Sequence, residues 1–270
     1  MAATRVARAG PASDTSRARV SGGVVEQVGW PFQGDTRNGS RSREDEVAAL
    51  IESILPSGVV AAELYEDPPG LAPHPLEAPL VAKAVDKRKR EFTSARHCAR
   101  VAMEKLGVEP APVMRGASGA PQWPKGVVGS LTHCDGYRAA VLAYSMQVRS
   151  VGIDAEPHGP LPDGVLDAVS IAAERDWLAS QNDDGTHWDR LLFCAKEATY
   201  KAWEPLTGRW LGFEDAHITF ERTGVGEDVS GTFHSRLLVP GDTQAGPALT
   251  SFDGRWLVQG GLIVTAIAVV

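Results

Sequence analysis

The sequence predicts a mixed α/β (α+β) fold that is built from two similar halves. Residue identity shows no internal repeat, but each half alternates helices with strands and ends in a β-hairpin. The first half ends in two apolar runs over 127–144, and the second ends in apolar runs over 249–270. Apolar runs separated by turn residues are typical of paired strands. We expect an N-terminal half over 46–150 and a C-terminal half over 151–270.

The first 45 residues differ in composition from the rest of the chain. Ala, Gly, Ser, Arg and Thr dominate, large apolar side chains are few, and neither helical nor strand periodicity is present. A segment of this kind cannot bury enough apolar surface to offset the entropy that folding costs. We therefore expect residues 1–45 to form a disordered, dispensable extension.

The N-terminal half is predicted to contain a helix over residues 81–106. Its apolar residues recur every three or four positions, which is the spacing of a buried helix face. The inward positions are Val85, Phe92, Ala95, Ala99, Ala102 and Leu106. The outward or flanking positions are Lys87, Arg88, Lys89, Arg90, Arg96 and Arg100. A basic face of this kind is either simply solvated or binds an anion, and the helix alone does not decide between the two.

A hairpin is predicted over 127–144, because Asp135-Gly136, a dipeptide favoured in tight turns, separates its two apolar runs. Thr132 and His133 then come at the end of the first strand. A lone histidine is more often structural than functional. A hydroxyl followed by an imidazole at a sheet edge is nevertheless well suited to holding a phosphate oxygen.

A short strand is predicted over 149–158, next to the middle of the chain. Its alternation places Gly152, Asp154 and Glu156 on one face. Two carboxylates about 7 Å apart repel each other unless solvent or a cation separates them, and Pro157 ends the strand just beyond. Oxygen donors of this kind suit Mg²⁺, with Mn²⁺ as the second candidate. A solvated strand end is the ordinary alternative.

A second helix is predicted over 188–203. Its buried stripe consists of Leu191, Leu192, Ala195, Ala198 and Ala202. Glu197 and Lys201 lie one turn apart and project together. Such a pair is common on solvated helices and contributes only about 0.2–0.5 kcal/mol, so it does not indicate function by itself. Together with the two carboxylates of the predicted strand, however, Glu197 is a candidate for the third carboxylate of a cation site.

The last apolar stretch of the chain contains two dipeptides that favour tight turns. They are Asp253-Gly254 and Gly260-Gly261. We therefore expect the C-terminal half to end in short strands that are joined at both places.

Composition argues against several classes of protein. With 43% hydrophobic and 23% charged residues, the 270-residue chain is ordinary for a globular protein. A net charge of −7 argues against a general nucleic-acid binder, because a phosphate backbone is bound by clustered Lys and Arg. No apolar run is long enough to predict a membrane span. Three scattered cysteines, Cys98, Cys134 and Cys194, form no disulfide framework and indicate a reducing cytoplasm.

Three segments carry a more specific pattern when they are taken together. They are Ser130–His133 with the sequence SLTH, Gly152–Glu156 with GIDAE, and Phe193–Lys201 with FCAKEATYK. In this order they match motifs of one family, and the chain resembles the 4′-phosphopantetheinyl transferases of the Sfp/EntD type over roughly residues 48–270. The resemblance is closest to the actinobacterial PptT-type enzymes, through the segments Ala62–Gly70, Arg96–Arg100 and Trp210–Phe220.

The resemblance implies a fold and an activity. The family has two α/β halves related by a pseudo-twofold axis, with coenzyme A bound in the cleft between them. Its members transfer the phosphopantetheine arm of coenzyme A to a serine of an apo acyl, polyketide or peptidyl carrier protein and release 3′,5′-ADP. Both halves of one chain would close around one pyrophosphate, so we expect a monomer.

The resemblance also implies catalytic roles. Asp154, Glu156 and Glu197 would hold Mg²⁺ against the pyrophosphate of coenzyme A. Glu197 is also the candidate base for the serine proton, directly or through water, and these two roles compete. Lys201 would neutralise a phosphate oxygen, and His133 completes the expected catalytic set.

Contacts with coenzyme A are implied in the same way. They are Arg88, Arg96, Arg115, Gly116, Ala117, Ser118, Thr132, His133, Asp154, Lys196, Glu197 and Lys201. The chain departs from the family pattern at Ser118, where a second basic residue is common, so this position offers only a hydroxyl. Ala155, between the two carboxylates of the strand, offers a metal no side-chain ligand.

Two other functions stay open on the residues alone. A non-catalytic module that binds coenzyme A or a carrier protein would not need both strand carboxylates together with Glu197 and Lys201. A Mg²⁺-dependent phosphohydrolase of a nucleotide diphosphate linkage would use the same carboxylates with an activated water. Release of 3′,5′-ADP without a carrier would favour hydrolysis, and tight binding of coenzyme A without turnover would favour the module.

Overall fold

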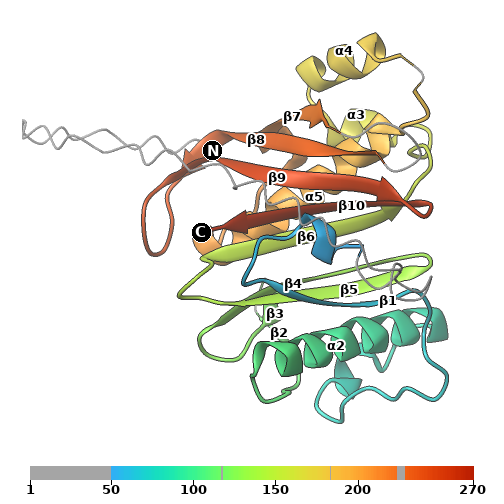
Figure 1. Cartoon of the computed structure of the whole chain (residues 1–270), viewed down its shortest axis with the longest axis vertical. Coiled ribbons are helices and arrows are strands. Elements are labelled where there is room, and N and C mark those ends of the chain that lie inside the picture. Colours follow the sequence, from blue (N-terminus) through green and yellow to red (C-terminus); the bar gives the residue numbers. More distant parts are fainter. Residues whose placement is uncertain (1–49, 117, 183, 224–228) are drawn as a thin grey trace, which may run out of the picture.

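The structure is a computed structural model, shown in Figure 1. It describes residues 50–116, 118–182, 184–223 and 229–270. Two of the sequence predictions, the extension over 1–45 and the contact made by Ala117, lie outside these residues. Within the described ranges, no helix is both long and apolar enough to cross a bilayer.

In its described residues, the N-terminal half contains one long helix and five strands. Its elements are η1 (Glu52–Ile54), β1 (Val60–Leu64), η2 (Ala78–Val81), α2 (Asp86–Leu106), β2 (Met114–Arg115), β3 (Pro121–Gln122), β4 (Val127–Cys134) and β5 (Tyr137–Tyr144). The C-terminal half contains the second long helix. Its elements are β6 (Ser150–Pro157), α3 (Val165–Val169), α4 (Ala172–Ser180), α5 (Trp188–Thr207), η3 (Phe213–Asp215), β7 (Ala216–Arg222), β8 (Val229–Gly241), β9 (Leu249–Gln259) and β10 (Leu262–Val269).

The two halves repeat one topology. In each, a first strand is followed by a long helix and later by a hairpin, and the first strand pairs antiparallel with the last strand of that hairpin: β1 with β5, and β6 with β10. The strand orders are accordingly β1-β5-β4 in one sheet and β6-β10-β9-β8-β7 in the other, with β7 and β8 added to the second half. The prediction of an α/β fold with two similar halves is therefore confirmed.

Side-chain hydroxyls join the two sheets where β4 lies beside β6 (Figure 1). The Ser130 hydroxyl accepts the N–H of Ile153 at 3.1 Å, and the Thr132 hydroxyl accepts the N–H of Ala155 at 3.1 Å. These hydroxyls of β4 therefore satisfy backbone donors on the edge of β6 that a neighbouring strand would otherwise satisfy. As a result, the end of β4 is held against the strand that carries Asp154.

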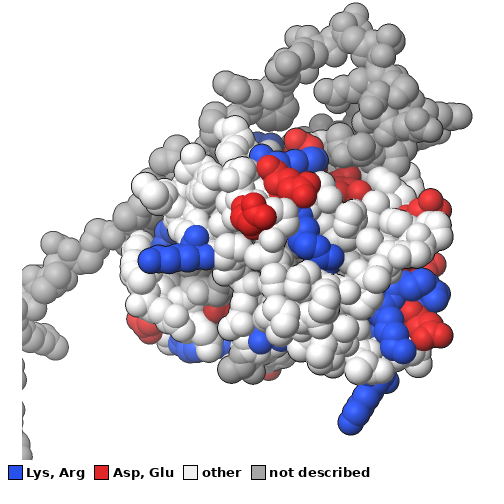
Figure 2. Space-filling view, turned by 90° about the horizontal axis from the view of Figure 1, so that it is seen from below, with Lys and Arg blue, Asp and Glu red and all other residues white. Residues whose placement is uncertain are grey.

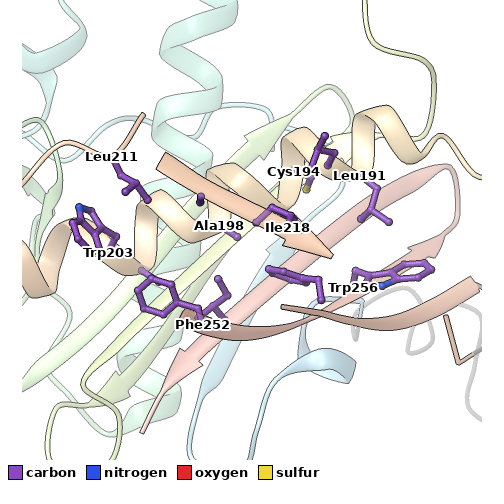
Figure 3. Close-up of a cluster of buried hydrophobic side chains, with 14 of the residues drawn as sticks. Leu191, Cys194, Ala198, Trp203, Leu211, Ile218, Phe252 and Trp256 are labelled. Carbon is purple, nitrogen blue, oxygen red and sulfur yellow. The ribbon is translucent and has the colours of Figure 1, made fainter. Parts of the chain in front are cut away.

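Buried side chains form three clusters around the two sheets. One lies between α2 and the first sheet, and a second lies between α5 and the second sheet. Figure 3 shows Leu191, Cys194 and Ala198 of α5 in this second cluster with Phe252 and Trp256 of β9. The third cluster contains side chains from η1 and from both sheets. Because this last cluster is shared, burial of its apolar side chains holds the two halves together.

The predicted helix over 81–106 is shorter at its start. The α-helix begins at Asp86, and Val85 before it has an extended backbone with φ −67° and ψ 157°. Val85 is 74% exposed, so the prediction that it points inward is wrong. The short 3-10 helix η2 ends at Val81, and the extended Val85 lies between η2 and α2.

The solvent face of α2 is not a continuous cationic surface. Lys87 pairs with Asp135 at 3.0 Å, and Lys89 pairs with Asp86 at 3.4 Å. Figure 2, a view from below Figure 1, shows basic and acidic side chains interspersed among uncharged residues on this side of the molecule. The exposed part of the basic pattern is therefore largely a set of solvated ion pairs.

One of the predicted turns is wrong. Asp253-Gly254 lies inside β9, where Gly254 pairs with Phe233 of β8. A Cβ atom at Gly254 would lie 2.2 Å from the Phe233 ring, so the glycine makes room for an aromatic side chain. The turn at Gly260-Gly261 is confirmed, with φ of 60° and 78°.

Candidate active site

A cavity of about 360 Å³ collects side chains from both halves of the protein. Most of the predicted site residues line it: Arg88 and Arg96 from α2, Arg115 from β2, Thr132 and His133 from β4, Asp154 and Glu156 from β6, and Glu197 and Lys201 from α5. These residues come from distant parts of the sequence. The fold therefore places the predicted cations and the predicted carboxylates around one space.

Close packing of α5 on β6 brings the two helix residues to the strand. A Cβ atom at Gly152 would lie 2.1 Å from the Ala198 carbonyl oxygen and 2.6 Å from the Ala202 nitrogen. Only glycine allows the helix backbone to approach the strand this closely. Because α5 lies so close to β6, Lys201 Nζ reaches the strand and donates to the Ile153 carbonyl at 3.1 Å and to Asp154 Oδ1 at 2.7 Å.

Asp154 is buried with one of its oxygens occupied and the other free. The residue is 5% exposed, and its Oδ1 accepts hydrogen bonds from Thr132 Oγ1 at 3.0 Å and from Lys201. Oδ2 is also buried but has no hydrogen-bond partner among the described residues. An unpartnered buried carboxylate oxygen is costly, and a cation in the cavity would supply the missing partner.

Glu156 follows the same pattern two residues further along β6. Its Oε2 accepts a hydrogen bond from Arg190 Nη1 at 2.9 Å, and the structure gives Oε1 no partner in the described ranges. Burial and the charge of Asp154 raise the pKa of Glu156, while Arg190 lowers it. The two carboxylates therefore affect each other electrostatically, as expected from their alternation in sequence.

Glu197 is the carboxylate without a protein partner. It forms no hydrogen bond or ion pair with any part of the chain that the structure describes. Burial raises the pKa of Glu197, Lys201 opposes the shift, and Asp154 adds to it. A carboxylate of this kind is free to accept a proton or to bind a cation.

The three carboxylates do not form a ready-made metal site. Among the described residues, no three His, Cys, Asp or Glu side chains stand together as metal ligands. The reason is visible in their contacts, because Asp154 turns one oxygen to Lys201 and Glu156 turns one to Arg190. The free Oδ2 of Asp154 nevertheless fits a cation with oxygen ligands such as Mg²⁺.

The opposite wall of the cavity is basic. Arg96, which was predicted to lie outward on the helix or to flank its buried face, is only 6% exposed and lines the cavity. Its guanidinium lies 3.4 Å from the centre of the Phe92 ring, and its Nε donates to the Val113 carbonyl at 3.0 Å. Burial lowers the pKa of Arg96 to about 10, and the nearby charges of Arg115 and Arg88 contribute. Glu91, 3.6 Å from Arg88, and the charge of Glu77 near Arg96 offset part of the repulsion among these cations, and a bound anion would offset more of it.

His133 belongs to this basic wall. Arg88 Nη1 is hydrogen bonded to its Nε2. Burial, and after it the charge of Arg88, lowers the pKa of His133. The neutral imidazole that this favours can accept the hydrogen bond from Arg88, which fixes where the guanidinium lies in the cavity.

Comparison with known proteins agrees with this geometry. A model described as the 4′-phosphopantetheinyl transferase N-terminal domain matches residues 76–143, and one described as the 4′-phosphopantetheinyl transferase superfamily matches residues 150–237. The chain belongs to the 4′-phosphopantetheinyl transferase family. Both matches include residues that line the cavity.

Two relatives extend the match to nearly their whole length. The chain is 62% identical over 221 residues to 4′-phosphopantetheinyl transferase Npt of Nocardia iowensis, covering 81% of this chain and 99% of the relative. It is 59% identical over 225 residues to 4′-phosphopantetheinyl transferase PptT of Mycobacterium tuberculosis, covering 82% and 98%. Enterobactin synthase component D of Salmonella typhi is 28% identical over 186 residues, covering 68% and 73%. The resemblance to PptT-type transferases is confirmed.

Some predicted contacts of the transferase lie away from this cavity. Lys196, whose side chain is 2% exposed, pairs with Glu174 of α4 at 2.8 Å and donates to the Ala216 carbonyl at 3.0 Å. Gly116 and Ser118 line a neighbouring cavity of about 620 Å³ instead. The two cavities share Lys201 and part of the loop before β4 in their linings, so they lie next to each other in the transferase.

Two charged residues outside the cavity lining, each bound to a neighbour of the cavity, carry no role in the sequence prediction. Arg190 binds Glu156, and it lies seven residues before Glu197 and eleven residues before Lys201, a spacing that places the three on one helix face. Glu77 is completely buried and accepts the N–H of Val113 at 2.7 Å. Val113 lies two residues before Arg115, which lines the cavity. The helical spacing could have indicated Arg190, but nothing near Glu77 in the sequence indicates its partner.

Proposed function

We propose that this transferase moves the phosphopantetheine arm of coenzyme A to a serine of an apo acyl, polyketide or peptidyl carrier protein, with 3′,5′-ADP as the second product. One observation carries the proposal. A single cavity has guanidinium groups on one wall and three carboxylates with a lysine on the other. Coenzyme A has a 3′-phosphate to match the first wall and a pyrophosphate to match the second.

The basic wall supports binding of the nucleotide end. Arg88, Arg96 and Arg115 all line the cavity, and the last two lie near the same Phe92 ring. Guanidinium groups bind phosphate through charge-assisted hydrogen bonds, so the 3′-phosphate would relieve their mutual repulsion. Thr132 and His133, at the end of β4, would then lie between the nucleotide and the carboxylates.

The carboxylate wall fits a divalent cation. Asp154, Glu156 and Glu197 would hold Mg²⁺, with Mn²⁺ as the alternative, and the unpartnered Oδ2 of Asp154 supports this donor set. When bound, the cation neutralises negative charge on the pyrophosphate as the phosphorus–oxygen bond breaks.

The protein's own side chains supply the remaining chemistry. The serine oxygen of the carrier forms a bond to the phosphorus attached to pantetheine, and the bond from this phosphorus to the bridging oxygen breaks. Glu197, which has no hydrogen-bond or ion-pair partner among the residues that the structure describes, takes the serine proton directly or through water. Lys201 keeps its charge, because the nearby carboxylate of Asp154 raises its pKa although burial lowers it. It stabilises a phosphate oxygen.

Mass spectrometry of a carrier protein tests the proposal directly. The protein is incubated with coenzyme A, Mg²⁺ and an apo carrier, using one acyl or polyketide carrier and one peptidyl carrier, with a chelator in the control. We expect the carrier serine to gain one phosphopantetheine arm only when the metal is present. Release of 3′,5′-ADP without a modified carrier, or binding of coenzyme A without turnover on either carrier, would contradict the proposal.

Replacing Arg88 by Ala should weaken coenzyme A binding about ten- to hundredfold, the cost of losing a hydrogen bond to a charged group. Isothermal titration calorimetry with coenzyme A and with dephospho-coenzyme A measures the effect. The loss should be much smaller for the second ligand, which lacks the 3′-phosphate. Lys89→Ala is the matched control, because Lys89 is a neighbouring cation of α2 that pairs with Asp86 outside the cavity. Equal losses for both ligands would contradict the assignment.

A further inference from the structure

Arg190 is fixed next to the carboxylate wall by contacts that do not depend on a ligand. Its Nη1 donates to Glu156 Oε2 at 2.9 Å, its Nε donates to the Gly159 carbonyl at 3.3 Å, and its Nη2 donates to the Pro160 carbonyl at 2.6 Å. Asp189, the residue before it, accepts the N–H of Leu161 at 2.8 Å. The first turn of α5 therefore binds the segment after β6, and each nitrogen of the Arg190 guanidinium donates a hydrogen bond.

The carboxylate wall carries nearly balanced charge before any ligand binds. Three carboxylates, Asp154, Glu156 and Glu197, face the two protein cations Lys201 and Arg190. Lys201 occupies one oxygen of Asp154, and Arg190 occupies one oxygen of Glu156. A divalent cation that enters this wall alone meets a small net negative charge and repulsion from both side chains.

We propose that Arg190 is a positioning residue that keeps the divalent cation from binding strongly to the carboxylates until coenzyme A is present. The inference rests on the proposed function, which places a cation at this wall. The pyrophosphate of coenzyme A adds negative charge and oxygen ligands, so it restores the attraction that the protein cations cancel. Cation and coenzyme A therefore increase each other's affinity, and this coupling is reciprocal.

Loss of the Arg190 charge has two opposing effects on cation binding. Glu156 loses the hydrogen bond that orients it, which weakens binding by making the ligand more mobile. The cation loses the repulsion of a fixed positive charge beside it, which strengthens binding. The electrostatic effect is the larger one, because it acts on a doubly charged ion at a site where the Arg190 and Glu156 side chains are only 18% and 19% exposed, whereas the orienting bond holds one oxygen of one of the three carboxylates.

Binding of Mn²⁺ to the complete chain, measured by electron paramagnetic resonance, tests this coupling. We expect Arg190→Gln to bind Mn²⁺ without coenzyme A about tenfold more tightly than the wild type, within the usual range of coupling between sites. Added coenzyme A should tighten Mn²⁺ binding in the wild type and tighten it much less in the variant. If Asp154→Asn no longer binds Mn²⁺ in the same measurement, the bound Mn²⁺ is assigned to this wall.

Control variants separate charge from packing. Arg190→Lys keeps the positive charge but not all three guanidinium hydrogen bonds, so its Mn²⁺ affinity without coenzyme A should stay much closer to that of the wild type than to that of Arg190→Gln. Arg175→Gln removes a cation that pairs with Asp167 elsewhere in the same half, and its affinity should equal that of the wild type. Arg190→Met, which keeps an unbranched side chain, carries the same expectation as Arg190→Gln if the glutamine variant does not fold.

The outcomes distinguish this inference from the proposed function. If Arg190→Gln binds Mn²⁺ without coenzyme A no more tightly than the wild type, while the wild type binds it with coenzyme A, the role of Arg190 is wrong and the transferase mechanism stands. If the wild type binds no Mn²⁺ at Asp154 even with coenzyme A, the cation site itself is wrong. Carrier modification measured in parallel shows whether the transferase function is affected.

Discussion

Replacing Glu197 by Gln is expected to lower the rate of carrier modification about a thousandfold or more while the protein stays folded. General acid–base catalysis contributes about 10²–10⁴ to a rate, and the same change removes a predicted ligand of the cation. The fold should tolerate it, because Glu197 makes no hydrogen bond or ion pair with the described residues and leaves no partner unsatisfied. Single-turnover kinetics on an apo carrier and thermal unfolding measure the two effects.

The pH dependence of the rate distinguishes the two roles of Glu197. A base must be deprotonated, and burial raises the pKa of Glu197 above the ordinary value of a glutamate. The kcat/KM of the wild type should therefore fall as the pH decreases through this raised pKa, and the residual activity of Glu197→Gln should lack that decrease. If Glu197 only binds the cation, a higher Mg²⁺ concentration should restore most of the activity.

An exposed glutamate in the same half provides the control. Glu221 lies on β7 outside the cavity, so Glu221→Gln should leave the rate within about twofold of the wild type, as surface substitutions usually do. Full activity of Glu197→Gln would contradict both proposed roles. An unfolded variant would show that Glu197 contributes to stability in a way that its missing contacts do not suggest.

The sequence predicted the strand and the helix of the carboxylate wall because their patterns are local. Alternation in 149–158 places Asp154 and Glu156 on the face opposite the apolar core, and the structure shows this arrangement in β6. Helical spacing places Glu197 and Lys201 on one face, and both line the cavity. Local periodicity is sufficient when the residues that act together lie on one element or on directly packed elements.

Lys196 shows what the family pattern leaves out. It is next to Glu197 in the motif, but a helix turns about 100° per residue, so Lys196 projects in a different direction from Lys201. In the structure its partner is Glu174 of α4, more than twenty residues earlier in the chain. Burial lowers the pKa of Lys196 against the effect of this pair. Its position depends on a tertiary contact that no local pattern reports.

The burial of Arg96 and the place of Gly254 inside a strand were missed for the same kind of reason. A cation on a basic helix is normally exposed, but Arg96 lies over the Phe92 ring and donates to Val113, which arrives from after the helix. Asp-Gly is a strong turn signal, but Gly254 is needed because the Phe233 ring of the neighbouring strand occupies the space of its side chain. Both predictions used single-segment preferences where contacts across the fold decide.

Replacing Gly152 by Ala is expected to destabilise the protein by about 3 kcal/mol, at the upper end of the usual cost of overpacking. The added Cβ would lie 2.1 Å from the Ala198 carbonyl oxygen and 2.6 Å from the Ala202 nitrogen. These are backbone atoms of α5, so no side-chain rotation relieves the contact and the helix must move away from β6. The melting temperature should fall by about 6–12 °C, which differential scanning calorimetry measures.

Loss of activity should exceed the loss of stability in this variant. Lys201 reaches the Ile153 carbonyl and Asp154 only because α5 lies so close to β6, and a displaced helix lengthens both hydrogen bonds of 3.1 and 2.7 Å. Carrier modification measured well below the lowered melting temperature should therefore fall about tenfold or more, since small displacements of catalytic groups are costly. Gly159→Ala is the control for stability, because a Cβ there meets no atom within 4 Å. If Gly152→Ala melts within about 2 °C of the wild type, the predicted overpacking is wrong, and if it also keeps full activity, the close approach of helix and strand does not position Lys201.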